Sequence, residues 1–121
     1  NVSMDQTTLE NRSMLRIQCH GAGVGSWRTS VALPAGKYRF SGLARARNVV
    51  PESAQRGSGG GLRISRSQRA NQLSGSADWT RLDHEFTVEA GGADVLLVCE
   101  LIAREGEIWY DIESLVVERI E

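Results

Sequence analysis

The chain contains few residues that could carry out hydrolytic catalysis at neutral pH. His20 and His84 are its only histidines, and neither lies in a recognisable nucleophile motif. In the segment LDHEF, period-two alternation places His84 beside exposed Asp83 and Glu85, so we expect a solvated strand histidine. No pair of carboxylates stands out for glycoside hydrolysis. We therefore predict that the chain is not an enzyme.

Two ligand-binding motifs are incomplete in this sequence. The glycine-rich run at 57–61 lacks the following lysine and serine or threonine of a phosphate-binding loop, so we predict an ordinary loop. Arginines interleave with Trp27, Tyr38 and Phe40, as in proteins that bind single-stranded nucleic acid. Alternation places Tyr38 and Phe40 in the core, however, and the net charge is only −1. We therefore expect no nucleic-acid partner.

Positive charge gathers in the middle of the chain. Residues 28–69 carry nine cations against a single acid, Glu52, and the last third of the chain is acidic. Such an asymmetry indicates either an anionic partner or strands that neutralise each other across a sheet.

The two cysteines are too few for a disulfide framework. Cys19 and Cys99 each end an alternating apolar series, so both side chains are predicted to point into the core. We expect buried free thiols, with a single disulfide as the alternative if the two strands are neighbours in an oxidising compartment.

Short β-strand signals separated by turn signals must position these residues. The strand signals fall at residues 14–19, 27–33, 37–47, 61–66, 79–88, 94–102 and 107–118, and residues 4–10 are either one more strand or an irregular lead-in. Glycine-rich clusters between them, including GAGVGS at 21–26 and AREG at 103–106, are predicted turns. Many short strands without a helix signal predict an all-β fold, an antiparallel β-sandwich or jelly roll.

The predicted strand at 37–47 has two different faces. Its core face carries Tyr38, Phe40, Gly42, Ala44 and Ala46, and its polar face carries Lys37, Arg39, Ser41, Leu43, Arg45 and Arg47. The polar face must meet water, acids or a ligand.

The length of 121 residues fits one domain with one core. No apolar run approaches the ~20 residues of a membrane span, so no membrane partner is expected. The chain begins Asn-Val-Ser without an initiator methionine, which favours a single domain over residues 1–121 taken from a larger or processed protein.

Several motifs, taken in order, resemble those of a known family. They are LPAGKYRFSGLARARN at 33–48, GGGLRIS at 59–65, SADWTRLDHEFTV at 76–88, DVLLVCEL at 94–101 and GEIWYDIESLVV at 106–117. Over about residues 13–118 the series resembles the jelly-roll carbohydrate-binding modules of the galactose-binding-like superfamily, especially families 4/9 and 22. The resemblance implies a non-catalytic module that binds a polysaccharide or oligosaccharide on its concave sheet. It also implies a secreted, periplasmic or cell-surface protein with neighbouring domains.

The resemblance assigns roles to individual residues. Trp27 falls where such modules place a sugar-facing aromatic, Arg45 matches the arginine that closes the central strand, and Glu100 matches an acid directed at the ligand. Together with Arg63 they form the predicted carbohydrate-binding site. The position of Trp79 is a structural one in this family, so Trp79 is expected to pack in the core.

The arginines extend this prediction towards acidic glycans. Depending on strand register, Arg39, Arg45, Arg63 or Arg66 would line the binding face. In the alternative interpretation the same fold is a structural or protein-interaction module, in which Arg45 and Glu100 pair across strands. An exposed Trp27 would support binding, and a buried Trp27 would favour the scaffold.

The last motif also implies a metal. In the resembled families an aspartate at the place of Asp111 often binds a structural calcium ion together with backbone oxygens. The Asn-Gly-x-Phe-Glu strand that supplies further ligands is not recognisable before Ser3, so calcium at Asp111 is an expectation with an incomplete ligand set.

Overall fold

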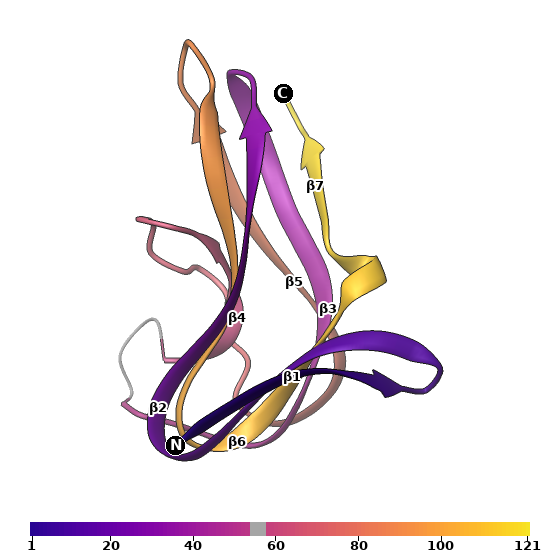
Figure 1. Ribbon diagram of the computed structural model, residues 1–121. Coiled ribbons are helices and arrows are strands. Elements are labelled where there is room, and N and C mark those ends of the chain that lie inside the picture. The colour runs from indigo at the N-terminus through magenta and orange to yellow at the C-terminus, as the bar shows by residue number, and fades with distance from the viewer. Residues whose placement is uncertain (54–57) are drawn as a thin grey trace.

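The computed structural model describes residues 1–53 and 58–121, so Arg56 and Gly57 lie outside the described residues. Its strands are β1 (Val2–Leu9), β2 (Arg12–Leu33), β3 (Gly36–Pro51), β4 (Gly59–Ile64), β5 (Gly75–Val88), β6 (Ala93–Asp111) and β7 (Val116–Arg119). The short 3₁₀ helix η1 (Ile112–Ser114) is the one helical element of the described chain. Figure 1 shows the long strands β2, β3 and β6 bending through the molecule.

All strand pairs are antiparallel. The order is β1-β2-β6-β3-β5, with β4 pairing with β6 and β7 pairing with β3. One layer holds the second half of β2, the first half of β6, and β4. The facing layer holds β1, the first half of β2, the second half of β6, β3 and β5, with β7 beside the start of β3. The predicted all-β sandwich is confirmed.

Two of the predicted turns are corners inside long strands. β2 and β6 stay paired from Met14–Asp111 to Leu33–Ala93, with a register shift between His20 and Gly23. Gly21 and Gly106 have φ of +123° and +115°, a region that side chains disfavour. The prediction of turns at 21–26 and 103–106 is therefore wrong, because glycine bends the strands there without ending the ladder.

Glycine also lets the layers approach each other. A Cβ at Gly60 would lie 2.3 Å from Ile108 Cδ1, and a Cβ at Gly25 would lie 2.6 Å from Ile17 Cγ2. The glycine run at 59–61, predicted as a loop, therefore forms the start of β4, a strand that packs closely on the opposite layer.

The core lies between the layers and contains the predicted core face of β3, whereas Ser41 of the predicted polar face is also buried. Tyr38, Phe40, Ala44 and Ala46 are buried, in agreement with the alternation in the sequence. Cys19 and Cys99 are buried free thiols, as predicted. Burial raises the pKa of Cys99 to about 12, so this thiol is unreactive at neutral pH. The 4–10 segment is part of β1, which pairs with β2 from Val2–Cys19 to Leu9–Arg12.

Candidate functional site

The residues of the predicted carbohydrate-binding site lie in three separate places. Arg63 and Glu100 are in contact with each other on β4 and β6. Trp27 lies on β2, opposite Cys99, and Arg45 lies on β3 in the other layer, opposite Trp109. The structure therefore joins only Arg63 and Glu100.

Glu100 forms a buried ion cluster with two arginines. Its Oε1 accepts from Arg63 Nε at 3.0 Å, and its Oε2 accepts from Arg69 Nε at 2.9 Å. The side chains of Glu100 and Arg69 are 3% and 0% exposed. A buried carboxylate is tolerated because both of its oxygens carry charge-assisted hydrogen bonds. Glu100 therefore has its oxygens committed to the protein interior.

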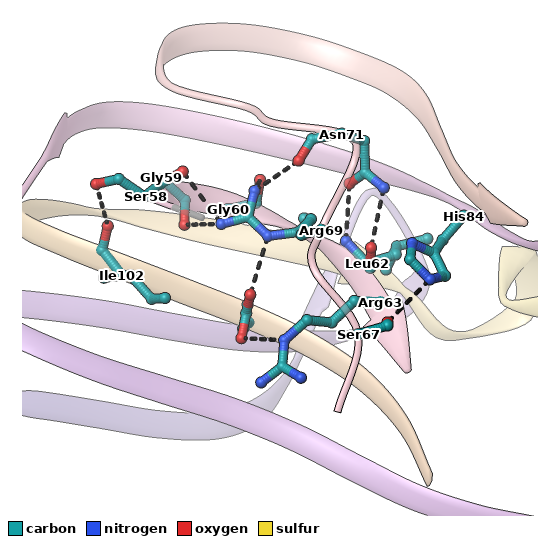
Figure 2. Close-up of polar contacts among 12 residues, drawn as sticks. Ser58, Gly59, Gly60, Leu62, Arg63, Ser67, Arg69, Asn71, His84 and Ile102 are labelled. Carbon is teal, nitrogen blue, oxygen red and sulfur yellow. Dashed lines mark hydrogen bonds and ion pairs between the residues drawn. The ribbon is translucent and has the colours of Figure 1, made fainter. Parts of the chain in front are cut away.

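Arg69 fastens the segment between β4 and β5 onto the sheet (Figure 2). Its guanidinium donates to the carbonyl oxygens of Ser58, Gly59, Gly60 and Asn71. The Asn71 side chain accepts from Leu62 N and donates to Leu62 O, so it pairs with the free edge of β4 as a neighbouring strand would. The cluster closes this edge of the sandwich, which is a structural role.

His84 belongs to the same closed edge, and its predicted solvent exposure is wrong. It is 5% exposed and shares the inward face of β5 with Leu82. Its Nε2 lies 3.1 Å from Ser67 Oγ, while its Nδ1 has no partner among the described residues (Figure 2). Burial, and then the nearby charge of Arg63, lower the pKa of His84. Alternation along β5 places His84 on the face opposite to exposed Asp83 and Glu85. The prediction wrongly assigned His84 to the solvent because both of its neighbours in the sequence are charged.

Trp27 is half-buried at the opposite edge of the sandwich. It packs against the core, and its indole N–H donates to Arg16 O at 3.2 Å. The exposure of Trp27 is therefore intermediate. It matches neither the exposed indole expected of a sugar-binding module nor the buried indole expected of a structural module.

A second group of polar and aromatic side chains lies on the outer face of β6 and β3. Trp109 is half-buried beside its cross-strand partner Arg45, while Ile108 and Tyr110 on either side of it point into the core. The β1–β2 hairpin extends across β3 (Figure 1), and its tip residue Glu10 reaches Arg45 Nη1 at 3.2 Å. Aromatic and ionic groups from β6, β3 and the β1–β2 turn therefore meet on one face.

Glu10 also connects this face to β5. Its Oε2 accepts from the Trp79 indole Nε1 at 3.3 Å. Trp79 is half-buried and is not among the side chains that pack on the core, so the prediction that it packs in the core is wrong. Alternation along β5 carried a sign of this, because Trp79 has the parity of exposed Arg81 and the opposite parity to buried Leu82.

Two adjoining hollows indent this outer face. The first has a volume of about 420 Å³ and is lined by residues that include Trp109, Arg45, Arg47 and Asp78. The second has a volume of about 440 Å³ and is lined by polar residues of β2, β3 and β6, again including Arg47. We name the surface formed by Glu10, Arg45, Arg47, Asp78, Trp79, Glu107 and Trp109 the Trp109 face.

The arginines around the Trp109 face are already paired with acids. Arg45 pairs with Glu10, Arg47 pairs with Glu107 at 3.9 Å, and Arg16 contacts both Glu107 and Asp5. The positive charge that gathers in the sequence is thus neutralised locally. Of the two interpretations of the charge asymmetry, mutual neutralisation across strands describes this face.

The surroundings of Asp111 do not fit a calcium ion. Arg12 Nε lies 2.7 Å from Asp111 Oδ2, and Asp111 Oδ1 accepts from Glu113 N at the start of η1. Within residues 1–53 and 58–121, no group of three His, Cys, Asp or Glu side chains could hold a metal. A guanidinium therefore occupies the position where a cation would bind.

The solved structures that share this fold include two that match almost the whole chain. One is TmCBM61 in complex with β-1,4-galactotriose, with a TM-score of 0.64 and 16% sequence identity, covering 98% of this chain and 87% of that chain. The other bears the description "CBM4 structure and function", with a TM-score of 0.63 and 15% identity, covering 98% of this chain and 77% of that chain. The likeness confirms the jelly-roll fold that the motifs implied.

No model of a protein family matches the sequence, and no curated protein matches it significantly. No helix in the described residues is long and apolar enough to cross a membrane.

Proposed function

We propose that this domain binds a carbohydrate on the Trp109 face, without catalysing a reaction on it. The observation that carries the proposal is the half-buried Trp109, which lines a hollow together with Arg45, Arg47 and Asp78. A pyranose presents an apolar C–H face that stacks on an indole, and its hydroxyl groups pair with charged side chains at the ring edge. Ligand sites commonly combine such an aromatic surface with a few polar groups.

The proposed ligand is a neutral sugar. Every arginine of the Trp109 face has a carboxylate partner, and Asp78 adds a further negative charge to the rim. A uronic acid would meet Glu10, Glu107 and Asp78, and would have to displace one of them to reach an arginine. This proposal departs from the acidic glycan that the sequence predicted. A secreted, periplasmic or cell-surface location and neighbouring domains remain part of it.

The contacts of Arg63 and Glu100 with other protein groups favour the alternative function, a structural or protein-interaction module. Arg63 and Glu100, two of the four residues that the sequence assigned to sugar binding, are held by protein partners. Under this alternative the Trp109 face would bind no sugar at all.

Calorimetry with neutral and uronic oligosaccharides, beginning with β-1,4-galactotriose, separates these functions. We expect binding of a neutral oligosaccharide that is lost in Trp109→Ala. The matched control is Trp27→Ala, which removes a half-buried indole from the opposite edge of the sandwich and should leave affinity unchanged in the folded protein. The absence of binding to any glycan at millimolar concentration would contradict the proposal, and loss in Trp27→Ala alone would restore the site predicted from the sequence.

A further inference from the structure

The second half of β2 has one hydrogen-bonding edge without a strand partner. Residues 23–33 pair with β6 on one side only. On the other side β1 covers β2 as far as Cys19, and His20 N donates to Asn1 O. Beyond that point no described residue forms a ladder with this second edge of β2, the edge away from β6. Unpaired edges of this length readily accept another strand.

An apolar cleft opens between this edge and the facing layer. It has a volume of about 550 Å³ and is lined mainly by carbon atoms of both layers, including Leu15, Trp27, Val31, Phe40, Leu97 and Leu115. Val116 on β7 borders it and is 48% exposed. The side chains of an added strand would therefore have an apolar space to enter.

We propose that this edge binds an extended peptide segment of a partner protein, which adds one antiparallel strand to β2. The added strand would run in the direction of β1, because β1 is itself antiparallel to β2 and lies on the same edge. Main-chain hydrogen bonds would hold the peptide, and every second side chain would enter the cleft.

The two faces of β2 define the chemistry of the peptide. Trp27, Thr29 and Val31 line the cleft, so the inward positions of the peptide must be apolar. Arg28 alternates with these residues along β2 and also borders the cleft; it donates to Ser26 Oγ at 2.9 Å and forms no ion pair with any described acid. An acidic residue of the peptide opposite Arg28 would supply the missing partner. The structure thus selects a segment in which apolar residues alternate with polar ones, including an acid.

A second copy of the domain fits the cleft less well. Its own β2 edge would bring Trp27 and Val31, which already pack against their own core. Both clefts would then stay open between the two copies. The side chains of an extended peptide have no such prior contacts and are free to fill the space.

The test uses a capped peptide of about eleven residues, one for each position of the free edge, in which valine alternates with glutamate. We expect amide shifts in the protein NMR spectrum that centre on residues 27–33, with slower hydrogen exchange there. Val31→Lys places a charge in the cleft and should weaken binding about tenfold or more. Arg28→Glu should weaken binding of this peptide and strengthen binding of a peptide in which lysine replaces glutamate.

Several results would overturn the proposal. These are no shifts at millimolar peptide, shifts centred on another edge, or equal binding of a peptide in which proline replaces valine and removes main-chain donors. Sedimentation showing a dimer that Val31→Lys disrupts would assign the edge to a second copy instead. Because the Trp109 face lies elsewhere, glycan binding should be the same with and without the peptide.

Discussion

The Trp109 face and the Arg63–Glu100–Arg69 cluster use the same residue types in opposite ways. Both join arginine to glutamate between segments that are distant in sequence. Glu100 is 3% exposed, whereas the Glu10 side chain is 57% exposed. Breaking a buried pair leaves an uncompensated charge, while an exposed pair contributes only about 0–1 kcal/mol. The exposed pair can therefore exchange its partner for a ligand, and the buried cluster cannot.

The sharpest way to test this difference is to remove each glutamate charge. Glu100→Gln leaves Arg69 buried without a counter-charge, and it should lower the free energy of unfolding by about 3–5 kcal/mol in urea denaturation. The matched control, Glu10→Gln, should change it by less than about 0.5 kcal/mol. Equal effects of the two substitutions would mean that burial does not separate the two regions.

Trp109→Ala tests the functional half of the comparison. Loss of the stacking surface should weaken binding of a neutral oligosaccharide at least about tenfold, which is about 1.4 kcal/mol. Trp109→Phe keeps a ring and should lose less. Calorimetry gives the affinities, and thermal unfolding shows whether the fold persists. Full affinity in a folded Trp109→Ala variant would remove this face as the binding site.

The closed edge around His84 should weaken in acid. Its pKa lies below the ordinary value of 6.5 in the folded state, because of burial and then Arg63, while Asp83 and Glu85 on the same strand point outward. The stability contributed by neutral His84 is thus fully present above pH 6.5 and is lost as the pH falls below that value. His84→Leu should unfold with a shallower decline between neutral and mildly acidic pH. A decline identical to that of the wild type would contradict this role.

The smallest expected effect concerns calcium. Because Arg12 forms an ion pair with the carboxylate of Asp111, the melting temperature should be the same in the presence of calcium and in the presence of a chelator. Arg12→Ala frees Asp111 Oδ2, so this variant is the one in which a calcium dependence could appear. A clear loss of melting temperature on chelation of the wild type would restore the expected metal site.

Local patterns were sufficient for the fold class and for most of the core. Alternation in the 37–47 segment correctly placed Tyr38, Phe40, Ala44 and Ala46 inside, and the series ending in Cys19 and Cys99 correctly predicted buried thiols. These predictions succeed because side chains alternate strictly along a strand, whatever the strand pairs with. The corners of β2 and β6 were missed because a glycine cluster looks the same whether a chain turns back or bends.

The sequence by itself determined a β-sandwich with a defined core and a surplus of arginine in its central part. Side-chain alternation along a strand separates Trp109 from Tyr110, but it does not show what faces Trp109. Only the tertiary structure decided which acid meets which arginine, and hence that Glu100 is buried with Arg69 while Glu10 bridges Arg45 and Trp79 on the surface. The physical reason is that these contacts depend on strand order and register, which arise from long-range packing and not from the local pattern of any one strand.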